Sequence, residues 1–250
     1  MGLQKLTSVF HEACGAYRSF VAGQNEMVDK GLAMVMLGSE YSLSAHLFDH
    51  AAVNFPMAER SWLSNVGRTS IDIYRILETA DSDRKVLVSG VARYVCMDFV
   101  SGNSVPFPTS PERHLSSAAS SPTARRFPSV KVPESGAVGS FLATVKVRYD
   151  DMDHNWHSNH ASYTAYALEC AAQAAAAGHY SRIRDDVAFY RALSWTCMHL
   201  GESFAGDELQ LSTWQDEDNA LLLHFLINRQ QQRICYIKIE FDEDSIASKL

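Results

Sequence analysis

The chain has 250 residues, a formal net charge of -7, and hydrophobic and charged fractions of 46% and 20%, which are ordinary for a globular protein. Its acidic balance argues against nonspecific nucleic-acid binding, because such binding needs a basic surface that displaces phosphate counterions. No apolar run approaches the length needed to cross a bilayer, so we expect no membrane span.

The first half of the chain, residues 1–108, predicts one helix followed by four strands. The helical stretch runs from Leu6 to Ala22. Runs of apolar and β-branched residues follow it and are separated by polar residues. We expect strands at 32–43, 51–61, 69–77 and 86–100. The sequence predicts no strand and no acidic loop before the helix.

A linker is predicted at 109–137. Six of the seven prolines lie between Pro106 and Pro133, and the same stretch contains a run of serine and alanine at 116–121. It lacks hydrophobic periodicity, and proline cannot continue a helix or a central strand. The linker therefore separates two halves, each of which is the size of a small domain.

The second half, residues 138–243, predicts a strand, a polar loop, a helix and four more strands. The helix is rich in alanine, which favours helices and lets a sheet pack closely. The order of one helix followed by four strands occurs in both halves. This repetition favours an α+β architecture built from a duplicated unit. Two unrelated α+β domains are the alternative. The expected elements are a strand at 141–149, the loop at 150–160, the helix at 162–179, and strands at 192–199, 208–215, 220–228 and 233–241.

The loop at 150–160 is crowded with Asp, His and Asn side chains. An EF-hand would need glycine where Trp156 stands and glutamate where Ser162 stands. A zinc or iron site could use the three histidines of the loop, but no H-E-x-x-H or comparable spacing is present. A solvated acidic loop without chemistry is the simplest alternative.

Hydrolysis is the remaining interpretation of this loop. Asp153, Asn155 and His157 alternate, so in an extended segment their side chains would project to one side and converge on a water or a carbonyl. The helix that follows would offer unpaired N–H groups and its positive dipole end to an oxyanion. Other hydrolase and nucleotide motifs, such as G-x-S-x-G or a phosphate-binding loop, are absent from the sequence.

From 147 to 163 the chain reads Val-Arg-Tyr-Asp-Asp-Met-Asp-His-Asn-Trp-His-Ser-Asn-His-Ala-Ser-Tyr. This segment resembles the signature of hotdog-fold thioesterases, in particular the plant-type acyl-ACP thioesterases, which have Asp-x-Asn-x-His before a tyrosine and a long helix. The resemblance extends into the first half through Asn65–Ser70 and Ala92–Asp98. It implies a tandem (double) hotdog, in which each half wraps an antiparallel sheet around a long helix and the first half lacks its initial strand.

The resemblance also implies which residues act on a thioester. Asp153 falls on a carboxylate shared with 4-hydroxybenzoyl-CoA-type enzymes. Asn155 and His157 fall on the catalytic amide and imidazole of the plant-type enzymes, and Glu202 falls near the later acidic residue of the family. Glu202 or Asp153 would activate water, or Asp153 would attack the thioester directly. An ordinary surface carboxylate is the alternative for Glu202.

Residues beside these groups are expected to bind substrate and to shape the loop. We expect Asn159 and Tyr163 to contact substrate. Trp156 stands where the family usually has Gly or Gln, and His160 where it usually has a second Asn. These two departures leave the loop geometry and the choice of substrate open.

The tail at 244–250 ends in Ser248-Lys249-Leu250, the tripeptide that peroxisomal import receptors read at an extreme C-terminus. We therefore expect the import receptor as a partner and a peroxisomal location, or a cytosolic one if the signal is not read. Peroxisomes supply CoA thioesters, so the expected function is hydrolysis of fatty acyl-CoA to free acid and CoA, without cofactor or metal.

Several alternatives stay open at this point. The motif also fits an acyl-ACP thioesterase, a noncatalytic acyl-CoA-binding or scaffold protein, and a hotdog hydratase. The sequence does not settle the acyl chain length or whether the chain forms a homo-oligomer. Its five cysteines are scattered and never spaced C-x-x-C, which indicates reduced and mostly buried thiols.

Overall fold

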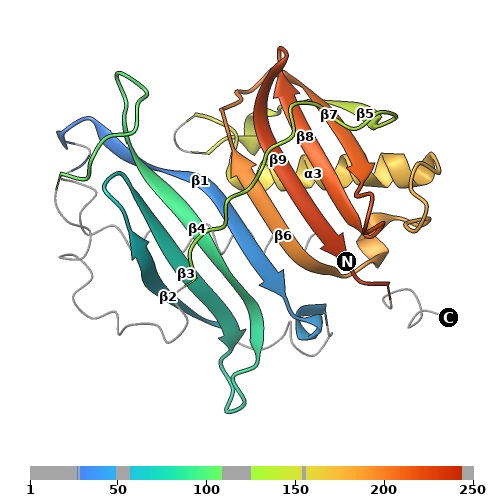
Figure 1. Ribbon diagram of the computed structural model, residues 1–250, viewed down its shortest axis with the longest axis horizontal. Helices are drawn as coiled ribbons and strands as arrows, with labels where there is room; N and C mark the ends of the chain where they lie inside the picture. The colour runs from blue at the N-terminus through green and yellow to red at the C-terminus, as the bar shows by residue number, and fades with distance from the viewer. Residues whose placement is uncertain (1–26, 28, 49–56, 109–124, 154–155, 244–250) are drawn as a thin grey trace. The chain divides into compact units, whose positions relative to one another are not determined.

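The computed structural model describes residues 27, 29–48, 57–108, 125–153 and 156–243. These residues belong to two compact units, with the boundary between 129 and 130. Each unit is built on an antiparallel sheet (Figure 1). The predicted combination of antiparallel sheets with a long helix is confirmed, and the four described cysteines are buried as expected.

The first unit contains four strands in the neighbour order β2-β3-β4-β1, all antiparallel. A short 3-10 helix, η2 (Ala45–Phe48), follows the first strand. The strands are β1 (Leu32–Leu43), β2 (Met57–Val66), β3 (Ser70–Thr79) and β4 (Val86–Asp98).

The bounds of β1 are those predicted, whereas β2 differs from its prediction. Within the described residues β2 starts at Met57 and continues past Ser61 to Val66. The polar residues Ser64 and Asn65 look like a turn, but the ladder with β3 carries the strand through them with an irregularity between Leu63 and Asn65. The helix predicted at 6–22 lies outside the described residues.

The second unit contains five strands in the neighbour order β6-β9-β8-β7-β5, also antiparallel. Its long helix is α3 (His160–Ala176), and two 3-10 helices are η5 (Tyr149–Asp151) and η6 (Val187–Phe189). The strands are β5 (Phe141–Lys146), β6 (Ala192–His199), β7 (Glu208–Gln215), β8 (Leu222–Arg229) and β9 (Gln232–Phe241).

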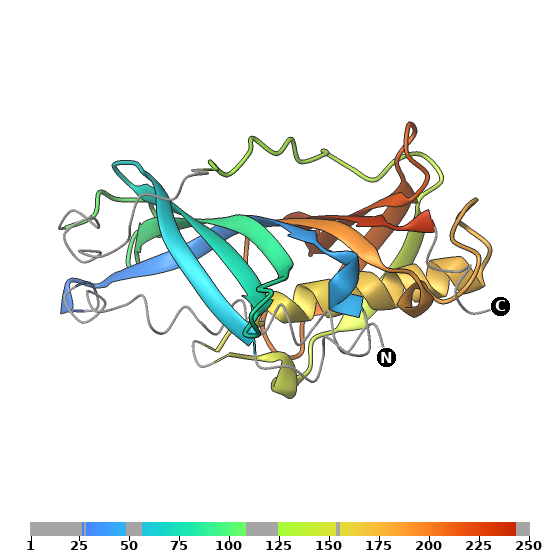
Figure 2. The same ribbon diagram turned by 90° about the horizontal axis from the view of Figure 1, so that it is seen from below.

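Helix α3 lies along one face of this sheet (Figure 2). Ala167, Ala171 and Ala174 recur at helical spacing and are fully buried, so the small side chains let the sheet approach closely. Leu223 and Phe225 are also fully buried. The prediction of an Ala-rich helix packed on a sheet is confirmed. No helix in the described part of the chain is long and apolar enough to cross a membrane.

The two units repeat one pairing scheme. Strands β2-β3-β4-β1 of the first unit follow the same order as β7-β8-β9-β6 of the second. The second unit has one more strand, β5, which pairs with β7 and leads through η5 into α3. Within the described ranges, the first unit has no counterpart of β5.

Candidate active site

The segment between β5 and α3 is anchored by a buried carboxylate. The Asp151 carboxylate accepts hydrogen bonds from the Arg148 backbone N–H at 2.8 Å and from its guanidinium at 3.2 Å. The Asp151 carbonyl oxygen accepts from the N–H of Asn159 at 2.8 Å and the hydroxyl of Ser162 at 3.2 Å. Strand β5 therefore ends at Lys146 rather than 149, because the chain turns to make these bonds.

Burial alone would raise the pKa of Asp151. The hydrogen bonds from Arg148 outweigh that effect and lower the pKa. Asp151 therefore stays ionised at neutral pH and holds the start of the loop to the start of the helix.

Beyond Asp151 the loop reverses direction, so the predicted extended segment is wrong. The N–H of Asp153 donates to the carbonyl of His157 at 2.8 Å, and the N–H of Trp156 donates to the carbonyl of Asp153 at 3.2 Å. Trp156 has a φ of 67°, the left-handed conformation that favours glycine. A glycine at this position would adopt the same conformation without strain.

The turn brings the imidazole of His157 between two carboxylates. Its Nδ1 lies 3.8 Å from Oδ1 of Asp153, and its Nε2 lies 3.8 Å from Oε1 of Glu202. Both distances exceed a direct hydrogen bond, although catalytic contacts are often long without substrate. The Glu202 side chain is 57% exposed, whereas His157 and Asp153 are 29% and 17% exposed. The predicted Asp153, His157 and Glu202 are thus brought together at a partly open site.

Asn155, the fourth predicted catalytic residue, lies outside the described residues. Its role as the amide that polarises the substrate carbonyl stays a prediction.

Buried hydroxyl groups fix the segment that carries Glu202. The backbone N–H of Ser158 donates to the carbonyl of Ser203 at 2.8 Å, and the two hydroxyls are also 2.8 Å apart. The hydroxyl of Tyr163 lies 3.0 Å from that of Ser203. Burial raises the pKa of Tyr163 to about 12, so it is a neutral phenol at neutral pH. Sequence reasoning missed Ser158 and Ser203, because serine is common and their pairing depends on the fold.

Asn159 and Tyr163 both have structural partners in this arrangement. Asn159 caps α3: its Oδ1 accepts from the N–H of Ala161 at 3.1 Å, and its carbonyl accepts from the N–H of Ser162 at 2.9 Å. These two amides are consequently engaged and do not point to an oxyanion, in contrast to the expectation for the start of this helix. Substrate contact by Asn159 and Tyr163 stays a prediction.

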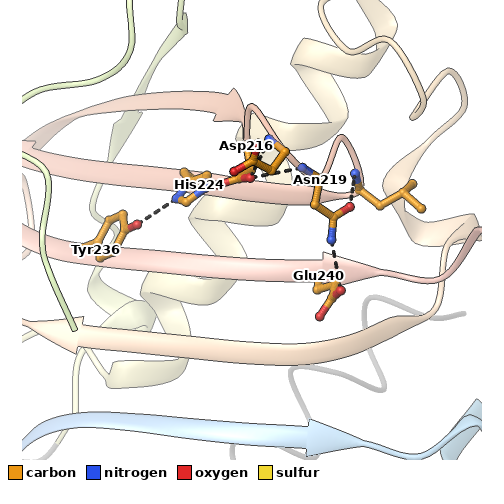
Figure 3. Close-up of polar contacts among 7 residues, drawn as sticks. Asp216, Asn219, His224, Tyr236 and Glu240 are labelled. Atoms are coloured by element: carbon orange, nitrogen blue, oxygen red, sulfur yellow. Dashed lines mark hydrogen bonds and ion pairs between the residues drawn. The ribbon is translucent and has the colours of Figure 1, made fainter. Parts of the chain in front are cut away.

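A second carboxylate–imidazole pair lies on the sheet and differs from the first (Figure 3). His224 uses both ring nitrogens, with Nε2 3.0 Å from Oδ2 of Asp216 and Nδ1 2.7 Å from the hydroxyl of Tyr236. Burial lowers the pKa of His224 and raises that of Tyr236 to about 12. The ring of Trp214 stacks on His224 at 5.3 Å between centroids. These closed contacts indicate a structural network.

No protein-family model and no curated protein matches the sequence. Solved structures do match the fold. An acyl-ACP thioesterase from Bacteroides thetaiotaomicron is 16% identical with a TM-score of 0.69, and the match covers 95% of this chain and 89% of that one. The 12:0-ACP thioesterase from Umbellularia californica is 13% identical with a TM-score of 0.72, with coverage of 95% and 89%. The chain has the acyl-ACP thioesterase fold. The predicted hotdog-type thioesterase fold is therefore confirmed.

Proposed function

We propose that the protein is a thioesterase that hydrolyses fatty acyl-CoA. The observation that carries the proposal is the position of His157 between Asp153 and Glu202, at the start of α3 and within a thioesterase fold. A carboxylate beside an imidazole is suited to removing a proton from water and to returning it to a leaving group. Fold alone would not justify this assignment, because one fold hosts many functions.

In the proposed reaction, one carboxylate accepts a proton as a water oxygen bonds to the thioester carbonyl carbon. Glu202 is the more exposed of the two carboxylates, which favours it as the group that meets this water. The C–S bond of the resulting tetrahedral intermediate then breaks, and the sulfur takes up the proton that the water gave to Glu202, which passes through His157. Asp153 orients His157, and Asn155 is the expected partner of the carbonyl oxygen. Direct attack by Asp153 to give an anhydride is the alternative route.

The repeated pairing scheme supports a tandem hotdog. Four strands with the same neighbour order occur in each unit, and the second unit wraps its strands around α3. The first unit would pack on the helix predicted at 6–22 in the same way. A structure determined by crystallography or cryo-electron microscopy with that helix elsewhere would refute this architecture.

The proposed CoA substrate rests on the terminal Ser248-Lys249-Leu250, which suits import into an organelle that handles acyl-CoA. Acyl-ACP is the second candidate, because the two similar structures are described as ACP thioesterases. The two substrate classes are compared by measuring thiol release from a series of acyl-CoAs and from a series of acyl-ACPs with the same acyl chain lengths. We expect a higher kcat/KM for acyl-CoA; a higher value for acyl-ACP would reverse the assignment. Binding of acyl-CoA without thiol release would instead indicate a noncatalytic carrier.

Localisation is tested separately. A reporter placed before the intact tail should be punctate and coincide with a peroxisomal marker, and removal of Leu250 should make it cytosolic. A diffuse signal from the intact tail would remove the reason to prefer CoA, but it would leave thioester hydrolysis untouched.

A further inference from the structure

Two cysteines and a histidine meet on the helix-facing side of the second sheet. Cys197 and His199 are two residues apart on β6 and so share a face, and Cys235 of β9 lies directly opposite His199 in the ladder. The sulfurs of Cys197 and Cys235 are 3.5 Å apart, and Nε2 of His199 is 3.5 Å from the Cys197 sulfur. All three ligand atoms lie within 4.8 Å of one another.

These separations fit ligands around one tetrahedral metal ion. Zinc binds sulfur at about 2.3 Å and nitrogen at about 2.0–2.1 Å. Tetrahedral angles then place two sulfurs about 3.8 Å apart, and a sulfur and a nitrogen about 3.6 Å apart. The two separations that involve Cys197 are within a few tenths of an ångström of these values. The His199 and Cys235 ligand atoms lie within 4.8 Å of each other, so a bound ion would draw these two side chains together.

A histidine of α3 lies beside this cluster. The ring of His160 lies 4.8 Å from that of His199, centroid to centroid. Cys197 and Cys235 are fully buried. Two thiolates would neutralise a divalent cation, so the loaded site would place no net charge in the interior.

We propose that Cys197, His199 and Cys235 form a binding site for a thiophilic transition-metal ion of the zinc class, with His160 as the fourth ligand. The site is separate from the acidic loop, because none of its ligands belongs to the Asp153, His157 and Glu202 group. Its ion would tie the first turn of α3 to β6 and β9, and it would act as a structural clamp rather than as part of the hydrolysis.

Cobalt substitution tests this proposal in the intact chain. Metal-stripped protein titrated with Co²⁺ under a non-thiol reductant should develop a near-ultraviolet thiolate-to-cobalt absorption that saturates at one equivalent and disappears when Zn²⁺ is added. Cys197→Ala and Cys235→Ala should each weaken or abolish the band. The matched control is Cys170→Ala, since Cys170 is equally buried but lies outside the cluster, and it should keep the band. No thiolate band in the wild type, or an unchanged band in both cluster variants, would overturn the proposal.

X-ray absorption of the zinc-loaded wild type covers the case in which a variant does not fold. We expect two sulfur neighbours at about 2.3 Å and two nitrogen neighbours at about 2.0–2.1 Å. A zinc ion surrounded only by nitrogen and oxygen would mean that the metal is bound elsewhere, and it would refute the site.

Discussion

The two units share an order of strand pairing but place their charged side chains differently. In the first unit the fully buried Asp72 forms two hydrogen bonds of 2.7 and 2.8 Å with Arg93, and it also accepts from the N–H of Phe127 at 3.2 Å. In the second unit the Asp153, His157 and Glu202 side chains are partly exposed in loops, with 3.8 Å between the imidazole and each carboxylate.

The two arrangements of carboxylates have different physical consequences. A buried carboxylate with direct partners fixes a sheet, because any movement would leave a charge desolvated. Groups near one another but not in direct hydrogen bonds leave space for a water or a substrate atom between them. Asp72 therefore stabilises the first unit, whereas the spacing of Asp153, His157 and Glu202 is consistent with the proposed hydrolysis.

The largest expected effect tests the structural side of this comparison. Asp72→Asn should lower the free energy of unfolding by about 3–5 kcal/mol, since it leaves the Arg93 charge beside a neutral amide. Urea unfolding measures the change. Asp83→Asn in an exposed turn is the control and should stay within about 0.5 kcal/mol. Loss of activity in Asp72→Asn protein that is still folded would break the proposed division of roles.

The second prediction tests the catalytic side. Asp153→Asn and His157→Ala should each lower kcat/KM for thioester hydrolysis by about 100-fold or more, equal to about 2.7 kcal/mol, with little change in unfolding. The matched control is Asp150→Asn, because the Asp150 side chain is 75% exposed in the same loop. Full activity in Asp153→Asn would contradict the assignment, and an equal loss in Asp150→Asn would reduce it to a general effect of loop charge.

The third prediction concerns Asp151, a structural carboxylate of the second unit. Hydrogen bonds to charged groups contribute about 1.5–3 kcal/mol, so Asp151→Asn should destabilise the protein by that order at pH 7. Because the pKa of Asp151 is lowered on folding, its contribution is present above the unfolded-state pKa, about 3.9, and is lost as the pH falls through the folded value. The free energies of unfolding of wild type and variant should therefore converge as the pH falls below about 4. A constant difference down to pH 2 would rule out the ionised carboxylate as the cause.

The smallest expected effect concerns the turn at Trp156. The left-handed conformation costs a non-glycine residue about 1–2 kcal/mol, and the edge contact of Trp156 with Tyr149 offsets part of that cost. Trp156→Ala keeps the strain and loses the contact, whereas Trp156→Gly loses both. The glycine variant should thus be more stable than the alanine variant by about 1 kcal/mol in urea unfolding. The opposite order would mean that the turn is not strained.

Most of the second unit could be predicted from its sequence, because hydrophobic periodicity and turn residues mark each strand clearly. The bounds of β6 and β7 are those predicted, and α3 starts only two residues early because Asn159 caps it. Such caps depend on local geometry that periodicity does not report. The end of β2 was missed for a different reason, because pairing with β3 carries the polar residues Ser64 and Asn65 into the strand.

The candidate site was predictable in composition but not in shape. The motif predicts Asp153 and His157 as site residues, and the structure places the His157 imidazole 3.8 Å from the Asp153 carboxylate. The expected extended loop is wrong, because hydrogen bonds close a turn between them. The Ser158–Ser203 contact joins positions 45 residues apart, and the cluster of Cys197 and Cys235 depends on the register of β6 with β9. Long-range register is set by packing, so a scan of local spacing cannot detect these pairs.

We propose that, among the residues that the structure describes, the catalytic groups all belong to the second unit, so that each chain has one active site. Titration with a non-hydrolysable ketone analogue of the best acyl-CoA substrate, followed by calorimetry, counts the sites directly. We expect saturation at one analogue per chain. The analogue should bind more weakly to the Asp153→Asn variant, but not to Asp72→Asn protein that remains folded. Two equal sites per chain would contradict the account.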